Sequence, residues 1–261
     1  EVGQSMSYVC VVGGANVDIE GRVLKTLLPG DSNPGTVIRS PGGVGRNIAE
    51  NLARLDVPTH LITALGRDDN GMWLHDLTAA SGVELADSVW SDLAPTATYL
   101  SVLDSSGEMA VAVNDMAVMG SLDVAALDAR SDTLEHAAAV VMDCNLASET
   151  IGHLATTHTG IPLFVDPVSV AKAVRVAPHL ASVHPLKPNR AEAAMLSGVE
   201  ISGERSLKTA ANALLDTGVR HVVISLAGDG VFFANAETSG TLTPPVQDIA
   251  SVTGAGDALM A

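Results

Sequence analysis

Tyr8-Val9-Cys10-Val11-Val12-Gly13-Gly14-Ala15-Asn16-Val17-Asp18 is the stretch from which the fold is predicted. An uninterrupted apolar run that ends in two glycines is typical of a buried strand in a parallel sheet, and such sheets bind ligands at the carboxyl ends of their strands. Asn16 and Asp18 follow with a period of two, so their side chains are expected to point the same way and to hydrogen-bond a diol. An Asx-turn is the alternative explanation. No G-x-G-x-x-G follows, so the glycines are not a dinucleotide fingerprint.

The rest of the chain alternates between strand and helix patterns. Strands are predicted over 60–66, 138–143, 162–166 and 221–225, and helices over 71–81, 148–157 and 206–217. This order favours a single α/β domain with a central, mostly parallel sheet.

Two segments depart from that alternation. The turn-rich segment 21–40 and the hairpin pattern of 98–103 with 109–114 predict a small β-strand lid, formed by insertions at about 19–40 and 96–116. A long surface loop is the alternative for the first segment.

Polar residues follow several predicted strands, at Asp143-Cys144-Asn145, Asp166-Pro167 and Lys187-Pro188-Asn189. Because ligands bind at this edge of a parallel sheet, the recurrence indicates a site there. Asn189 and Glu192 also have the spacing of a helix capping box, and Asp166 before a proline is a common turn. Leu226–Gly230 is expected to be either a plain hairpin turn or a loop that contacts a nucleotide.

Two glycine-rich loops each precede a helical pattern. Pro41-Gly42-Gly43-Val44-Gly45-Arg46-Asn47 leads into the helix predicted from Ile48, and its glycines allow a ligand to touch the backbone. The chain has no Gly-Lys pair, which excludes a Walker A loop.

Ser251-Val252-Thr253-Gly254-Ala255-Gly256-Asp257 is the second loop. Its N–H groups are expected to bind an anion at the start of a helix, with Asp257 placed to take a proton from an attacking hydroxyl. The alternative is a helix capped by Thr253, with Asp257 as a first-turn acid.

Composition limits the partners. The chain has 261 residues, 47% of them hydrophobic, a net charge of −16 and 3% aromatic residues. Such acidity repels nucleic acid, and few aromatic rings are available for stacking bases. No apolar run reaches the length of a membrane span and no secretory signal begins the sequence, so no membrane partner is expected. Two cysteines in strand-like contexts fit a reducing cytoplasm.

Taken together, these motifs resemble the ribokinase-like (PfkB) carbohydrate kinase family along nearly the whole chain. The resemblance rests on Asn16-x-Asp18, Gly42-Gly43 with Asn47, Asn189-x-x-Glu192 and Gly254-Ala255-Gly256-Asp257. Within the family the sequence is most similar to the branch that phosphorylates pseudouridine in bacteria, through Gly14–Asp18, Asp31–Gly35, Pro41–Asn47, Asn114–Met116, Asp143–Asn145, Val165–Ser169 and Leu186–Arg190.

The resemblance implies a three-layer sandwich with a lid, and ATP-dependent phosphorylation of the 5'-hydroxyl of free pseudouridine. It assigns catalysis to Asp257 as base and to Gly254, Ala255 and Gly256 as the anion hole. The substrate-binding residues that it implies are Asn16, Asp18, Asn33, Gly42, Gly43, Asn47, Asn114 and Asn145. Those implied for the nucleotide are Lys187, Asn189, Ser225, Gly228, Gly230, Gly254 and Gly256, with Glu192 and Asp166 holding Mg²⁺ through water.

Further expectations come from the same source. Some family members bind a monovalent cation such as K⁺ near the position of Ser251, and many pair through their lids as dimers. Members continue for several tens of residues past the position of Ala261, so the C-terminal part of the domain is expected to be missing from this sequence. If those residues are absent from the protein itself, weak ATP binding and little activity are expected. Ala227 stands where the family often has glycine.

Two alternatives stay open from the sequence. One is a kinase of the same family for another nucleoside or a furanose sugar, because the motifs specify a ribose-like hydroxyl pattern better than a base. The other is a nucleoside-binding protein without turnover.

Overall fold

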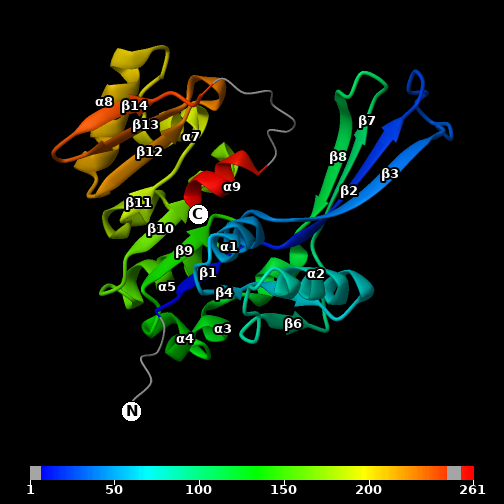
Figure 1. Cartoon of the computed structure of the whole chain (residues 1–261), viewed down its shortest axis with the longest axis horizontal. Helices are drawn as coiled ribbons and strands as arrows, with labels where there is room; N and C mark the ends of the chain where they lie inside the picture. The colour runs from blue at the N-terminus through cyan, green and yellow to red at the C-terminus, as the bar shows by residue number, and fades with distance from the viewer. Residues whose placement is uncertain (1–6, 246–253) are drawn as a thin grey trace.

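The computed structural model describes residues 7–245 and 254–261, and its centre is an eight-stranded sheet (Figure 1). Six neighbouring strands are parallel, and two antiparallel strands extend one edge. In spatial order they are β4 (Thr59–Ile62), β1 (Val9–Val12), β9 (Ala139–Asp143), β10 (Leu163–Asp166), β11 (Pro185–Leu186), β12 (His221–Ser225), β13 (Val231–Asn235) and β14 (Ser239–Leu242).

Helices cover both faces of this sheet. On one face, Val11 and Val141 pack with Ile48 and Leu52 of α1 (Val44–Arg54) and with Met260 of α9 (Ala255–Met260). The opposite face packs against helices that connect the later strands. These are α3 (Val124–Asp128), α4 (Ser131–Glu135), α5 (Ser148–Thr157), α7 (Arg190–Ser197) and α8 (Glu204–Asp216).

Alternation along each strand divides the side chains between these two layers. Cys10 and Val12 belong to one apolar core, whereas Val11 between them belongs to the other. A strand that is apolar on both faces must be buried on both faces, which is why the run in the sequence is continuous. The predicted three-layer α/β fold is therefore confirmed.

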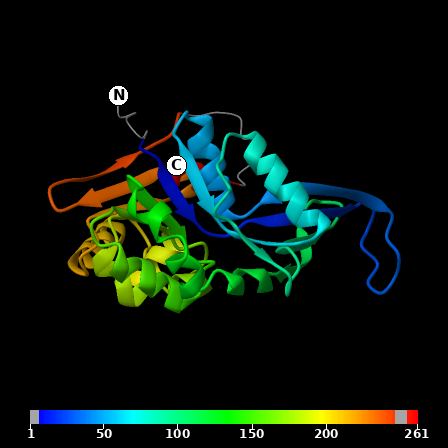
Figure 2. The same ribbon diagram turned by 90° about the horizontal axis from the view of Figure 1, so that it is seen from below.

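A second sheet of four strands projects from the body, as Figures 1 and 2 show. Its order is β3 (Gly35–Gly42), β2 (Asn16–Val23), β7 (Thr98–Leu103) and β8 (Met109–Asp115). These strands occupy the two segments predicted as a lid, and segment 21–40 is a hairpin rather than a surface loop. We refer to this sheet as the lid sheet.

Two short strands and a helix fill the corner between the body and the lid sheet. β5 (Ala64–Gly66) pairs with β6 (Val89–Ser91), and α2 (Asp69–Ala80) contacts β2 and β5. Arg39 of β3 lies over the ring of Trp73, 3.7 Å from its centroid, and fastens the lid sheet to α2.

Several predicted boundaries differ from the structure. The strand predicted over 60–66 is two strands, because the chain leaves the main sheet at Thr63 and Ala64–Gly66 pairs with β6 instead of β1. The helix predicted over 71–81 starts at Asp69, because the Asp68 side chain accepts from Gly71 N at 2.7 Å and caps it. The remaining helices and 3₁₀ turns are α6 (Val170–Ala173), Ala117–Ser121, Ala177–Ser182 and Ala227–Asp229.

Among the described residues, no helix is both long enough and apolar enough to cross a bilayer.

Candidate active site

The predicted site residues lie mainly at the carboxyl ends of β1, β9, β10 and β11 and at the starts of α1 and α9. Helices α1 and α9 pack side by side against the same face of the sheet (Figure 1). This packing brings together two loops that are about two hundred residues apart in the chain.

Asp257 and Asn47 meet where these helices pack. The Asn47 Nδ2 donates to Asp257 Oδ2 at 2.7 Å, across 210 residues of sequence. Burial raises the pKa of the Asp257 carboxyl, and the nearby Asp166 charge raises it further, whereas the Asn47 hydrogen bond, Lys187 and Arg46 lower it. A carboxyl whose pKa lies above its ordinary value is a stronger base than a free carboxylate, which suits it to accept a proton.

Helix α9 begins with glycine. Gly254 is its N-cap, with φ +78°, and the N–H groups of Ala255 and Gly256 follow in its first turn. The alternative cap, Thr253, and the cation position near Ser251 lie outside the described residues. A Cβ placed on Gly256 would lie 3.3 Å from Lys187 Nζ, so the end of β11 and the start of α9 are close neighbours.

The first glycine loop closes around Asp18. A Cβ on Gly42 would collide with the Asp18 carboxylate, and a Cβ on Gly43 would lie 2.5 Å from Gly14 O. Gly43 also has φ +100°, a backbone conformation that favours glycine. The glycine pair is therefore needed for close approach of the loop to the end of β1.

Asn16 and Asp18 share one hydrogen bond at the start of β2. Asn16 Nδ2 donates to Asp18 Oδ1 at 2.6 Å, and Asp18 is half-buried. Burial raises the pKa of Asp18, whereas Asn16 and Arg46 lower it. The two side chains therefore form a hydrogen-bonded pair at the start of β2.

Asp143, whose role the sequence analysis missed, connects the parts of this site. Its carboxylate is fully buried and accepts from Gly14 N at 2.8 Å, Gly45 N at 2.7 Å and Asn145 N at 2.8 Å. Burial raises its pKa. One side chain thus ties the β1 loop and the Gly42–Gly45 loop to the end of β9.

Asn145 follows it and contacts a lysine. Lys172 Nζ donates to Asn145 Oδ1 at 2.5 Å, and the Asn145 side chain covers Gly14 so closely that a Cβ there would lie 2.7 Å from Asn145 Nδ2. The pKa of Lys172 is lowered by burial. Arg175 Nη1 donates to the carbonyls of Cys144, Asn145 and Leu146 and braces this loop.

The predicted nucleotide and metal residues form a neighbouring group. Lys187 Nζ lies 2.9 Å from Asp166 Oδ2, with both side chains buried. Asn189 and Glu192 form the expected capping box of α7, and Glu192 Oε1 and Oε2 accept from Asn189 Nδ2 and N, both at 2.8 Å. Burial raises the pKa of Glu192, and Asp166 raises it further.

Mg²⁺ keeps several waters, which carboxylates can hold, and it takes other ligands from phosphates. Asp166 and Glu192 have that chemistry, whereas no group of three His, Cys, Asp or Glu side chains within 7–245 and 254–261 could hold an ion alone. The donor chemistry of these two carboxylates fits a metal held through water.

The β12–β13 turn holds the other predicted nucleotide residues. Ser225 ends β12 beside Asn189, and a Cβ placed on Gly228 would meet no heavy atom within 4 Å. The turn is a hairpin, and Ala227 has φ +53°, which explains why glycine suits this position.

Two predicted residues lie on the lid sheet. Register places Asn114 on the same face as Asp18, in a row that runs Ser40, Asp18, Tyr99, Asn114 across four strands. Asn33 instead lies in the loop between β2 and β3, where it accepts from Leu28 N and donates to Leu28 O and Asp31 O. The structure thus does not bring Asn33 to the other site residues.

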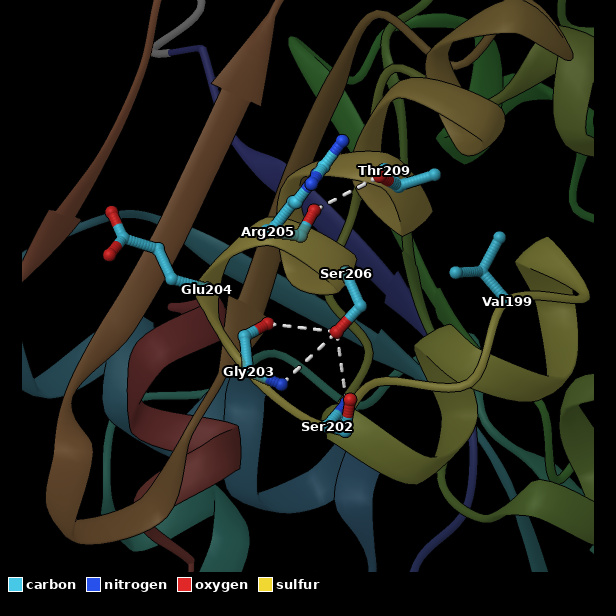
Figure 3. A pocket seen from close by; sticks show the side chains of 7 residues that line it. All are labelled: Val199, Ser202, Gly203, Glu204, Arg205, Ser206 and Thr209. Carbon is cyan, nitrogen blue, oxygen red and sulfur yellow. Dashed lines mark hydrogen bonds between the residues drawn. The ribbon is translucent and has the colours of Figure 1, made fainter.

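A separate hollow of about 530 Å³ lies at the start of α8 (Figure 3). Ser206 Oγ, near its centre, accepts from Ser202 N and Gly203 N. None of the predicted site residues lines it.

Comparison with known proteins places these motifs in context. The model of the pfkB family carbohydrate kinases matches residues 6–261. A pseudouridine kinase of Escherichia coli K12 is 40% identical over 255 residues, which cover 97% of this chain and 82% of that protein. A crystal structure of a putative sugar kinase from Clostridium perfringens superposes with a TM-score of 0.84 at 35% identity, covering 96% of this chain and 80% of that one. A ribokinase from Arabidopsis thaliana, solved with ribose and ATP, gives a TM-score of 0.84 at 22% identity, over 97% and 83% of the two chains.

Proposed function

This chain belongs to the pfkB family of carbohydrate kinases, and from that premise we propose that it transfers the γ-phosphoryl group of ATP to the 5'-hydroxyl of free pseudouridine. The observation that carries the proposal is the hydrogen bond between Asn47 and Asp257, which joins the first glycine-rich loop, Pro41–Asn47, to the predicted base. The 40% identity to a pseudouridine kinase over 97% of the chain supports the choice of substrate.

In the proposed reaction, Asp18 and Asn16 hold the ribose hydroxyls above Gly42 and Gly43. The proton of the 5'-hydroxyl passes to a carboxylate oxygen of Asp257 as the bond from O5' to phosphorus forms and the bond from phosphorus to ADP breaks. The N–H groups at the start of α9 stabilise the charge on the phosphoryl oxygens. Phosphoryl transfer needs positioning and charge stabilisation more than covalent help, and these residues would supply both.

On the nucleotide side we propose Lys187, Asn189, Ser225, Gly228 and Gly230 as the residues along ATP. Asp166 and Glu192 would hold Mg²⁺ through water, and the ion, when bound, neutralises phosphate charge. Lys187 is paired with Asp166 at 2.9 Å, and this pairing keeps a cation beside the start of α9.

We also propose that the lid sheet covers the substrate and pairs two copies of the chain. Tyr99 and Asn114 share the face of Asp18, which supports contact with the base. Val37, Val111 and Val113 lie on the opposite face and are 74%, 54% and 60% exposed. Valines exposed to this degree on one sheet favour burial against a partner. Sedimentation of the protein with Val111→Asp should show monomers where the wild type shows dimers, and wild-type monomers would reject the pairing.

The use of ATP makes the cytoplasm the proposed location.

Formation of ADP with pseudouridine, uridine, adenosine, ribose and fructose tests the function. The proposal expects the highest kcat/KM with pseudouridine. A higher value with another nucleoside or sugar would reassign the substrate, and tight binding of pseudouridine without ADP formation would indicate a binding protein.

A further inference from the structure

Arg46 is a buried cation that none of the proposed steps uses. It lies in the first turn of α1, is 5% exposed, and its backbone N donates to Gly14 O at 3.0 Å. Its Nε has no hydrogen-bond partner among the described residues. Burying a guanidinium raises the free energy of the fold unless its charge is paired and hydrogen-bonded, so the partners of Arg46 indicate what it does.

Those contacts form one continuous chain that ends at the predicted base. Glu50 Oε2 lies 2.6 Å from Arg46 Nη2, the same Nη2 donates to Asn47 Oδ1 at 2.8 Å, and Asn47 Nδ2 donates to Asp257 Oδ2 at 2.7 Å. Because Arg46 occupies the amide oxygen of Asn47, the amide nitrogen must face Asp257. Arg46 therefore determines which way the Asn47 amide points.

The charge of Arg46 acts on the same group. The charged groups that face Asp257 are Asp166, from the end of β10, Lys187, from the end of β11, and Arg46, from α1. Asp166 raises the pKa of Asp257, whereas Lys187 and Arg46 lower it. Arg46 also lowers the pKa of Asp18, so its charge influences the carboxylates of Asp257 and Asp18. The Glu50 carboxylate, which lies 2.6 Å from Arg46 Nη2, balances part of the positive charge of Arg46.

We propose that Arg46 is a positioning residue, which acts through Asn47 to orient the Asp257 carboxylate and to keep it ionised before the proton is transferred. This inference rests on the proposed function, because it assigns Asp257 as the base. Arginine suits the task because one planar group bonds both Glu50 and Asn47, which the compact ammonium on the flexible four-carbon stem of lysine does less well.

The test is the pH dependence of kcat/KM for pseudouridine in Arg46→Gln. Glutamine keeps an N–H donor but carries no charge, so the pKa of Asp257 should rise, and the acid limb of the profile should move to higher pH. In Arg46→Lys, which keeps the charge, the limb should stay where the wild type has it while kcat falls several-fold. A limb that moves in Arg46→Lys, or stays in Arg46→Gln, would overturn the inference.

Arg54→Gln is the matched control. Arg54 lies on the same helix and bonds Glu50 Oε1 through Nε at 2.9 Å and Nη2 at 2.6 Å, but its side chain is 68% exposed and donates no hydrogen bond to Asn47. The acid limb of Arg54→Gln should coincide with that of the wild type. A shift equal to that of Arg46→Gln would show a general effect of charge on α1 and would overturn the inference. Thermal unfolding confirms that each variant is folded; if Arg46→Gln is not, Arg46→Lys decides. Absence of pseudouridine-dependent ADP formation in the wild type would instead reject the proposed function.

Discussion

Replacing Asp143 should weaken both the fold and substrate binding, because its carboxylate holds three backbone N–H groups. Asp143→Ala leaves the N–H groups of Gly14, Gly45 and Asn145 without this acceptor. Each unpaired buried donor costs about 1–3 kcal/mol, so the free energy of unfolding should fall by at least about 3 kcal/mol. In Asp143→Asn, the amide oxygen can replace Oδ2, which serves Gly14 and Gly45, so only the Asn145 bond is lost and the cost should be about 1–3 kcal/mol.

Urea denaturation of the two variants measures this difference, and the KM for pseudouridine measures its effect on the site. The KM should rise several-fold in Asp143→Asn, because the same carboxylate positions both loops around Asp18. Asp68→Asn is the control, since Asp68 also accepts from two backbone N–H groups, those of Gly71 and Thr96, yet caps α2. It should lose stability with an unchanged KM. Equal stability of Asp143→Ala and the wild type, or equal KM shifts in Asp143→Asn and Asp68→Asn, would refute the reasoning.

Three further outcomes are expected. Gly42→Ala places a methyl group where the Asp18 carboxylate lies, so the KM for pseudouridine should rise at least about tenfold, or about 1.4 kcal/mol of binding. Gly160→Ala is the control, because a methyl group there meets open space and should leave the KM unchanged. Equal KM values in the two variants would contradict the steric conflict with Asp18. Lys187→Met leaves the buried Asp166 charge unpaired and should lower the free energy of unfolding by about 3–5 kcal/mol in urea titrations, and an unchanged midpoint would count against the pair. Burial and, after it, the charge of Asp166 raise the pKa of Asp257. As the pH is lowered, kcat/KM should therefore begin to fall at a pH above the range in which an ordinary carboxyl group titrates. An acid limb within that ordinary range would contradict the prediction.

Features that depend on local pattern could be predicted from the sequence. The apolar run at Val9–Val12 indicated a buried parallel strand, and the Asn189–Glu192 spacing indicated a capping box, because both follow from neighbours in the chain. The break at Thr63 could not be predicted, because pairing with a strand twenty-five residues later, β6, decides it.

The same limit applies to the site. The resemblance picked out Asp257 and Asn47 by motif, but their hydrogen bond spans 210 residues and required the packing of α9 on α1. Asp143 was visible as a polar residue at a strand end, and its role as the acceptor for Gly14 and Gly45 follows only from contacts across 129 and 98 residues. Arg46 is recognisable in the sequence only as part of a glycine motif, whereas its burial and its hydrogen bond to Asn47 follow from the packing of the fold.

The most direct test of the account compares the turnover of Asp257→Asn and wild-type protein with saturating pseudouridine and ATP. Loss of a general base lowers kcat by at least about 10²-fold, while the amide can keep the contact with Asn47 and so preserve binding of the nucleoside. A kcat within a few-fold of wild type in this variant would contradict the assignment of Asp257 as the group that takes the proton.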